Sequence, residues 1–223
     1  MNVVRAGTSP VGGCVEAEFL SRIEGLIHVG ANIGQERELY ARHGLEVLWF
    51  EPNPDVYGRL VRNLEAFPKQ HAFPYLVTDR DDEEYPFYLS NNDGRSSSIF
   101  DLNLHQELWP NVFYEGAISL RSVTLDTVLE RHAVSKRLLG ALVMDTQGSE
   151  LLVLKGAARH LSEIRYVKTE AADFEAYSKG CTVEQLTEYL SGFGFEEIVR
   201  EPFASRKAVG TYYDVTYANR RLV

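Results

Sequence analysis

Short apolar runs alternate with segments of helical periodicity along most of this chain of 223 residues. We interpret the apolar runs as buried strands, and they are LIHVG (26–30), LEVLWF (45–50), LGALVMD (139–145) and IRYVKTE (164–170). Helix formers fill residues 35–43 before Gly44, an amphipathic pattern follows Pro54, and a helix is expected from Ser149 to Leu161. Because parallel strands need long crossover connections, this alternation predicts an α/β fold with helices on both faces of a mostly parallel sheet.

The C-terminal part of the chain follows a different pattern. Thr182 and Gln185 have the spacing of a capping box, which predicts the start of a further helix. The segments FEEIV (195–199) and TYYDVTYA (211–218) are rich in β-forming residues, and no helical pattern separates them. We therefore expect an antiparallel hairpin to close the sheet.

No internal repeat, low-complexity tract or linker rich in Gly, Ser or Pro divides the chain, so we expect residues 1–223 to form a single domain. Apolar residues near helical spacing in 14–24 predict a short helix. Residues 1–24 are therefore expected to form an N-terminal helical extension. Residues 79–118 begin with an acidic cluster and lack a regular pattern, which is typical of a functional insertion or of a solvated loop.

The charge balance weighs against polyanionic partners. Asp and Glu number 32 and Lys and Arg number 23, which leaves a net charge of −9, whereas nucleic acid and anionic lipid attract basic surfaces. No apolar run approaches the roughly 20 residues of a membrane span, and the first residues lack the layout of a secretory signal. Cys14 and Cys181 match no zinc-ligand spacing. We expect a soluble, cytoplasmic protein that binds neither nucleic acid nor membranes.

Polar residues follow the predicted strands at their C-terminal ends, where ligands bind in open α/β sheets. The glycine-rich sequence VGANIG follows the first strand, and Thr78 and Asp79 end a third strand expected at about 71–78. Glu51, Asp145 and Glu170 end three further strands. Because these ends share one edge of a parallel sheet, we expect a polar site at that edge.

The glycine-rich turn is the most informative of these features. Gly30 and Gly34 permit a tight turn and let backbone N–H groups approach a ligand. Glu51 follows about 20 residues later, where an acid is placed to accept both hydroxyl hydrogens of a ribose. The spacing therefore indicates an adenosine-containing cofactor, either NAD or S-adenosylmethionine. The absence of a full G-x-G-x-x-G favours the second.

Five segments in order resemble the FkbM-like family of S-adenosylmethionine-dependent methyltransferases, over roughly residues 24–218. They are HVGANIGQE (28–36), WFEPNPDVYGRL (49–60), DGRSSSIF (93–100), VTLDTVL (123–129) and VMDTQGSELLVLKGA (143–157). The resemblance implies a Rossmann-like class I methyltransferase fold, with a seven-stranded sheet whose C-terminal strand is antiparallel. It also implies O-methylation of a hydroxyl on a small natural product or sugar.

The resemblance further implies which residues bind the cofactor. They are His28, Gly30, Ala31, Asn32, Gly34, Glu51, Pro52, Val77, Thr78, Asp79, Ser97 and Asp145. Ser97 belongs to the run Ser96–Ser98, which matches a serine pair of the family near the cofactor or substrate mouth. The family's first motif usually begins with Asp, whereas this chain has His28, which substitutes for it or is a structural histidine that points inward.

Methyl transfer to a hydroxyl usually needs a general base. Asp145 is the first candidate for its position at the end of a central strand, and Glu170 is the second. His105 and His132 are weaker candidates. Asp145, Glu170 and Asp173 offer the oxygen ligands that Mg²⁺ prefers, but nothing in their spacing requires a metal, so we favour no metal site.

Two other functions remain open from the residues alone. An NAD(P)-dependent oxidoreductase uses the same combination of glycines and acid, and so does a catalytically weak regulatory protein that binds an adenosine cofactor. Under the methyltransferase hypothesis, we expect residues 79–118 to form an insertion on the substrate side of the domain. The aromatic residues there suit stacking on a sugar or aromatic ring, and core packing explains them equally well: Tyr85, Tyr88, Trp109 and Tyr114.

Overall fold

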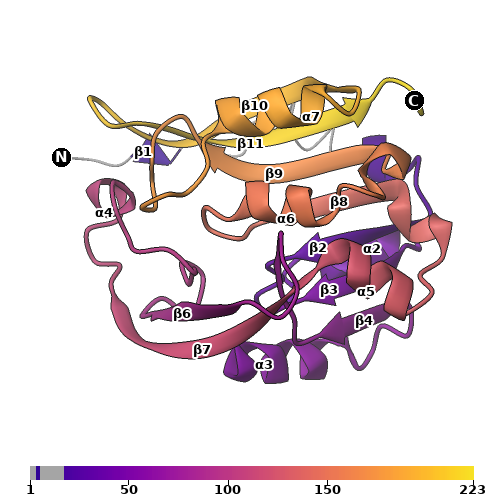
Figure 1. The fold of residues 1–223 in the computed structure, drawn as a ribbon, viewed down its shortest axis with the longest axis horizontal. Coiled ribbons are helices and arrows are strands. Elements are labelled where there is room, and N and C mark those ends of the chain that lie inside the picture. The colour runs from indigo at the N-terminus through magenta and orange to yellow at the C-terminus, as the bar shows by residue number, and fades with distance from the viewer. Residues whose placement is uncertain (1–3, 6–17) are drawn as a thin grey trace.

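The computed structural model describes residues 4–5 and 18–223, and the main sheet in this part of the chain has eight strands (Figure 1). In spatial order they are β1 (Val4–Arg5), β10 (Phe195–Arg206), β11 (Gly210–Asn219), β9 (Tyr166–Ala172), β8 (Ala141–Met144), β2 (Gly25–Val29), β3 (Glu46–Phe50) and β4 (Gln70–Phe73). β2, β3, β4, β8 and β9 are parallel, and β11 is antiparallel to both of its neighbours. The predicted mostly parallel sheet with an antiparallel C-terminal strand is confirmed, and the two-residue β1 extends it at the edge.

Helices cover both faces of this sheet, as predicted. α2 (Arg37–Arg42) and α3 (Pro54–Leu64) pack on one face over a core that includes Trp49 and Leu60. The opposite face carries α5 (Leu125–Arg131), α6 (Glu150–Gly156) and α7 (Val183–Ser191), which lie in front of the sheet in Figure 1. Alternate residues of each buried strand supply the two cores, because successive strand side chains point to opposite faces.

Side-chain caps explain where two of these helices begin. The Asn53 side chain accepts from the backbone N–H groups of Asp55 and Val56 at 3.1 and 3.4 Å, immediately before the proline that opens α3. The predicted capping box at α7 is confirmed, with the backbone N–H of Thr182 donating to Gln185 Oε1 at 2.9 Å. Both caps satisfy N–H groups that the helix itself leaves without partners.

A second sheet of three strands lies beside the main one, in the order β5 (Leu76–Thr78), β7 (Tyr114–Thr124), β6 (Glu84–Ser90). Figure 1 shows β6 and the long, curved β7 to the lower left of the main sheet. The single strand expected at about 71–78 is therefore wrong: β4 ends at Phe73, and β5 pairs with β7 instead of with β3. Pro74 lies at the break, where it offers no N–H to a ladder.

The predicted insertion contains more structure than its composition indicates. Within residues 79–118 lie β6, the one-turn helix α4 (His105–Leu108) and the first part of β7. Short 3₁₀ helices at Lys136–Gly140 and Leu161–Glu163 lead into β8 and toward β9. In the expected N-terminal helix, residues 18–20 are helical with Phe19 and Leu20 buried, and the preceding part lies outside the described residues.

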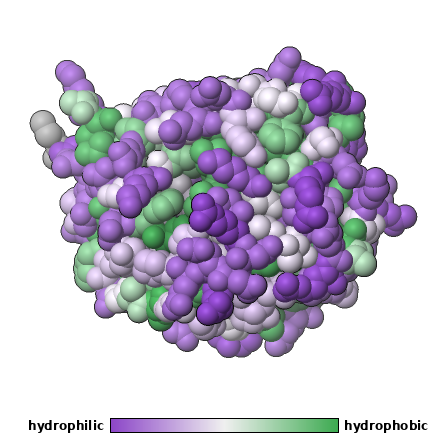
Figure 2. All heavy atoms as spheres, in the orientation of Figure 1, coloured by the Kyte–Doolittle hydropathy of each residue, from purple (hydrophilic) through white to green (hydrophobic). Residues whose placement is uncertain are grey.

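The surface of the described residues is mostly polar. Hydrophilic residues cover most of the face shown in Figure 2, with hydrophobic residues in separate groups between them. In the described part of the chain, no helix combines the length and the apolar character that crossing a bilayer requires.

Candidate functional site

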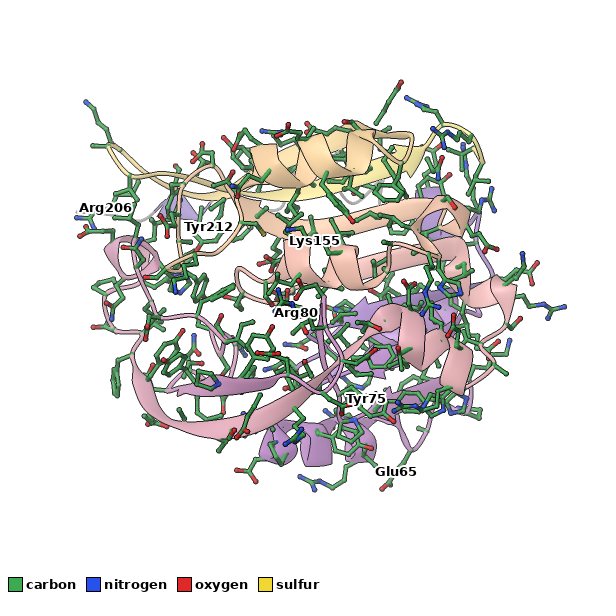
Figure 3. All side chains as sticks on the ribbon, viewed as in Figure 1. Glu65, Tyr75, Arg80, Lys155, Arg206 and Tyr212 are labelled. Atoms are coloured by element: carbon green, nitrogen blue, oxygen red, sulfur yellow. The ribbon has the colours of Figure 1, made fainter. Side chains whose placement is uncertain are left out.

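A cavity of about 670 Å³ lies at the carboxyl ends of β2, β3, β8 and β9, between the main sheet and the small sheet. Seven of the predicted cofactor-binding residues line it, and they are Gly30, Asn32, Glu51, Pro52, Val77, Ser97 and Asp145. Both predicted bases, Asp145 and Glu170, are also in its wall. Two labelled residues of the lining mark its extent in Figure 3, with Tyr212 toward α4 and Tyr75 toward α3.

The glycine-rich turn brings the backbone of β2 directly against the end of β8. Gly30 has a φ of +81°, and a Cβ built there would overlap the carbonyl oxygen of Asp145. The N–H groups of Gly30 and Ala31 both donate to the carbonyl of Phe50 at 3.0 Å, which ties the turn to the end of β3. Only glycine combines this conformation with so close an approach, so the turn delivers backbone, rather than side chain, to the cavity floor.

Glu51 is buried at the end of β3 with both carboxylate oxygens engaged. Oε2 accepts from the backbone N–H of Asn32 at 2.8 Å, and Oε1 accepts from that of Asn53 at 2.9 Å. Burial raises the pKa of Glu51 to about 7, and these two hydrogen bonds oppose the shift while the charge of Asp145 adds to it. Each oxygen has a second lone pair. Glu51 can therefore accept two ligand hydroxyls while it holds the turn.

Asp145 directly follows β8, Glu170 lies near the end of the neighbouring strand β9, and both residues are partly buried. Burial raises the pKa of Asp145 to about 7, and Gln147 Nε2, which donates to Asp145 Oδ1, opposes the shift. Burial also raises the pKa of Glu170 well above its ordinary value, and the charge of Asp145 adds to this effect. The hydroxyl of Tyr177 donates to Gln147 Oε1, which orients the amide beside Asp145.

Five predicted cofactor-binding residues are absent from the cavity lining. His28 points into the opposite core, where its ring stacks on Trp49 and its Nδ1 lies 3.3 Å from the hydroxyl of Tyr40. Burial lowers the pKa of His28 to about 3. Strand alternation accounts for this, because the neighbouring Val29 faces the cavity. The remaining four are Ala31, Gly34, Thr78 and Asp79.

Thr78 and Asp79 differ in their surroundings. Thr78 is fully buried and its hydroxyl donates to the carbonyl of Arg80 at 3.2 Å. Leu76 and Val77 are the residues of β5 that line the cavity. Asp79 lies outside the lining and pairs with Arg80 at 3.9 Å. Thr78 and Asp79 were expected at the end of one strand over 71–78 in the main sheet. Their position differs because β5 belongs to the small sheet.

One wall of the cavity is aromatic and joins segments far apart in the sequence. Trp109 and His105 come from α4 and its end, while Phe203 and Tyr212 come from the C-terminal hairpin. His105 Nδ1 lies 2.7 Å from the Tyr212 hydroxyl, and Nε2 lies 3.3 Å from Ser96 Oγ. Burial lowers the pKa of His105 to about 4, so its ring is neutral at neutral pH.

Sequence reasoning missed Phe203 and Tyr212 as site residues. The strand pattern that identified the hairpin carries no signal that its end folds over the cavity. Arg95 was also missed, although it stands in the DGRSSSIF segment. A search for the charged residue next to the serine run would have found it.

The residues considered for a metal or as weaker bases are distributed differently. Asp173 is exposed and accepts from the backbone N–H of Thr211 at 2.8 Å and from the Tyr213 hydroxyl at 3.1 Å, so it does not join Asp145 and Glu170. Across the described residues, no group of three or more His, Cys, Asp or Glu side chains has the geometry of a metal site. His132 packs against Phe73 outside the cavity.

Comparison with known structures identifies the fold. N-methyltransferase NodS from Bradyrhizobium japonicum, solved with S-adenosyl-l-homocysteine, superposes with a TM-score of 0.50 at 9% identity, over 96% of this chain and 89% of that one. A protein from Listeria monocytogenes superposes with a TM-score of 0.51 at 9% identity, over 95% of this chain and 68% of that one. The predicted class I methyltransferase fold is confirmed.

Two curated proteins are similar in sequence. The 2-O-methyltransferase NoeI from Sinorhizobium fredii is 26% identical over 176 residues, which are 75% of this chain and 71% of that protein. The hexuronic acid methyltransferase AglP from Haloferax volcanii is 28% identical over 146 residues, which are 64% of this chain. The chain spans about half the length of AglP, with 53% covered.

Residues 28–197 match the methyltransferase FkbM domain. This segment includes the glycine-rich turn, Glu51, the serine run and both candidate bases. The match decides against the oxidoreductase alternative and confirms the predicted family and enzyme class. The chain therefore belongs to the FkbM family of S-adenosylmethionine-dependent methyltransferases.

Proposed function

We propose that this protein transfers the methyl group of S-adenosylmethionine to a hydroxyl group of a sugar. The observation that carries the proposal is a single cavity with a buried acid for ribose at Glu51 and an aromatic wall at Trp109 and Tyr212. Asp145 lines the same cavity. Burial is the main cause that raises the pKa of Glu51 and that of Tyr212, and the charge of Asp145 adds to both shifts. The cavity therefore combines room for a cofactor and an acceptor with a partly buried carboxyl group.

The residues present fit the cofactor. The hydroxyl of Thr146 is buried in the cavity wall and is the one buried side-chain polar atom of the described residues without a hydrogen-bond partner. Buried polar atoms without a partner are rare, and in a cavity wall such an atom is available to a bound molecule. We expect Glu51 to hold the ribose hydroxyls, the turn from Gly30 to Asn32 to hold the methionine portion, and Val77 to contact the adenine.

The residues around the acceptor must position its hydroxyl group and remove the proton. When bound, S-adenosylmethionine supplies a methyl group that its positively charged sulfur already activates. The protein must orient an acceptor hydroxyl in line with that group, exclude water and remove a proton. Asp145 suits proton removal because its pKa of about 7 leaves a substantial ionised fraction at neutral pH. Glu170, whose pKa is raised well above its ordinary value, suits holding a proton.

The names of the two curated relatives support the choice of acceptor. NoeI is named a 2-O-methyltransferase, which places the methyl group on oxygen. AglP is named a hexuronic acid methyltransferase, and a hexuronic acid is an acidic sugar. The aromatic wall agrees with a sugar, since one face of a pyranose ring is made of C–H bonds that pack on aromatic rings.

Cofactor selection provides the first test of the proposal. S-adenosylhomocysteine should raise the melting temperature and give a saturable calorimetric titration, whereas NAD should do neither. Labelled S-adenosylmethionine should then transfer its methyl group to members of a panel of free glycosides. Binding of NAD instead of S-adenosylhomocysteine would contradict the cofactor assignment, and a labelled panel without sugar products would contradict the acceptor.

Substitution of Asp145 by asparagine should lower kcat about 10²–10⁴-fold, because the amide cannot accept the hydroxyl proton. The dissociation constant of S-adenosylhomocysteine should change less than threefold, which separates the chemical step from cofactor binding. Glu170→Gln tests the second candidate base. Asp173→Asn is the matched control, an acid at the same edge of the sheet that does not line the cavity. Full activity in Asp145→Asn would identify another base.

Cofactor binding should depend on pH through Glu51. Its pKa is about 7 in the ligand-free protein. The ionised carboxylate is a stronger acceptor for the ribose hydroxyls than the protonated carboxyl group, so binding lowers this pKa and releases a proton. The affinity for S-adenosylhomocysteine is therefore lost as the pH falls, with a dissociation constant about tenfold higher at pH 6 than at pH 8. Calorimetry across this range measures the slope. Glu51→Gln should flatten it, and an unchanged slope would assign the proton to Asp145.

A further inference from the structure

Arg95 is the only lysine or arginine among the described residues that line the cavity. It stands in the loop between β6 and α4, next to the serine run, and it is exposed. No hydrogen bond or ion pair engages its guanidinium group within the described residues. By contrast, the nearby Arg59 pairs with Asp93 at 3.4 Å. A cation without a partner in a ligand cavity is available to an anionic group of the ligand.

The neighbours of Arg95 place it between the two ends of the cavity. A Cβ built on Gly94 would lie 3.6 Å from Asn32 Nδ2, so Gly94 lies beside the glycine-rich turn. On the other side, Ser96 Oγ lies 3.3 Å from His105 Nε2 in the aromatic wall. Asn32 Nδ2 also donates to the carbonyl of Asp93 at 3.1 Å, which fixes the loop over the turn. Arg95 therefore enters the cavity where the two binding regions meet.

The aromatic wall is held rigid by its own contacts. His105 is fixed at both ring nitrogens, by Tyr212 and by Ser96. The ring centroid of Trp109 lies 4.6 Å from that of His105 and 5.0 Å from that of Tyr212. No hydrogen bond within the described residues engages the indole N–H of Trp109. The wall thus presents a fixed apolar surface with one free donor, which suits a ring that carries hydroxyl groups.

Arg95 is the positive group in a cavity that four acids also line, which are Glu36, Glu51, Asp145 and Glu170. Both oxygens of Glu51 accept backbone hydrogen bonds, and Asp145 accepts from Gln147. Burial raises the pKa of Glu170 well above its ordinary value, so Glu170 suits holding a proton. None of these acids pairs with Arg95 within the described residues, so its guanidinium group stays available to an anionic ligand.

We propose that the acceptor is an anionic sugar, whose ring packs on Trp109 and whose carboxylate pairs with Arg95 while a hydroxyl is methylated. This inference rests on the proposed function and adds the acceptor subsite to it. In the reaction the hydroxyl O–H bond breaks, its proton goes to the Asp145 carboxylate, and the oxygen forms a bond to the methyl carbon. The bond from that carbon to sulfur breaks, and its electron pair stays on sulfur. The sugar carboxylate is a recognition group and is not itself methylated.

Fluorescence tests this subsite directly. The chain has two tryptophans: Trp49 is fully buried in the core, whereas Trp109 lines the cavity. With S-adenosylhomocysteine present, methyl glucuronide should change the emission saturably, and methyl glucoside should bind about tenfold more weakly. Trp109→Phe should abolish the change in emission, and calorimetry then measures the remaining affinity.

Charge variants give the decisive comparison. Arg95→Gln should weaken binding of methyl glucuronide about tenfold, leave methyl glucoside within twofold, and leave the dissociation constant of S-adenosylhomocysteine within twofold. Arg59→Gln is the matched control, an arginine that contacts the same loop from outside the lining. It should change none of the three constants.

Three results would overturn the proposal. A tenfold loss of S-adenosylhomocysteine binding in Arg95→Gln would assign the guanidinium to the cofactor carboxylate. Equal affinity of the wild-type protein for the two glycosides would exclude a role for the sugar's charge. A methylated product that alkali hydrolyses would be an ester, which makes the carboxylate the acceptor. Failure of the proposed function itself is distinct, because the wild-type protein would then bind no S-adenosylhomocysteine.

Discussion

Substitution of Gly30 by alanine is expected to destabilise the protein by about 3 kcal/mol or more. The new Cβ would overlap the carbonyl oxygen of Asp145, and the residue has a φ of +81°, which costs a residue with a Cβ additional energy. The turn and the end of β8 must separate to relieve the overlap, and both lie in the cavity floor. Urea denaturation measures the loss, and the melting temperature should fall by roughly 6–12 °C.

Gly44 provides the matched control for this substitution. Its φ is +71°, similar to that of Gly30, but no atom lies within 4 Å of a Cβ built there. Gly44→Ala therefore carries the conformational cost alone, which is about 1–2 kcal/mol. The difference between the two variants isolates the steric contact with Asp145. Equal losses would show that the backbone absorbs this contact without cost.

Substitution of Glu51 by alanine should weaken binding of S-adenosylhomocysteine about 100-fold or more. The variant loses two hydrogen bonds from ribose hydroxyls to a charged acceptor, each worth about 1.5–3 kcal/mol. It also leaves the backbone N–H groups of Asn32 and Asn53 without their acceptor, which loosens the glycine-rich turn. Isothermal titration calorimetry measures the dissociation constant, and circular dichroism verifies that the variant is folded.

Two further variants sharpen this result. Glu51→Gln keeps the shape of the side chain, but its amide N–H₂ group cannot accept a hydrogen bond. The backbone N–H of either Asn32 or Asn53 then loses its acceptor. We therefore expect the affinity to fall almost as much as in Glu51→Ala. Glu46→Ala, at the half-exposed beginning of the same strand, is the control and should leave the affinity within twofold. A change of less than threefold in Glu51→Ala would remove this residue from the cofactor site.

Patterns read over a few residues predicted much of the sheet correctly. The runs at 26–30, 45–50, 139–145 and 164–170 became β2, β3, β8 and β9 with small changes at their ends. These strands are mostly buried on both faces, so they are mainly apolar, and the charged residues Glu46, Lys168 and Glu170 occupy partly buried positions. Their polar C-terminal neighbours then had to meet at one edge, and Glu51 and Asp145 do so in the cavity wall.

Predictions were weaker where a strand has one solvated face or where the chain changes sheets. β7 alternates exposed and partly buried positions over most of its length, so it resembled an irregular segment. The change of sheet after Phe73 depends on pairing with β7, whose residues Ser122–Thr124 lie far along the chain. The residues around Phe73 carry no pattern that indicates so distant a partner strand. Thr78 was therefore predicted to end a main-sheet strand and to bind the cofactor.

The sequence by itself determined the family, the parallel sheet and the acids that end its strands, because strand and helix periodicity and the glycine turn are local properties. Only the tertiary structure decided that His28 turns into the core while Glu51 faces the cavity. It also brought Trp109 beside Tyr212 and joined His105 to Tyr212 across 107 positions. These contacts arise when the C-terminal hairpin packs on α4, and such long-range packing depends on the whole fold rather than on any segment.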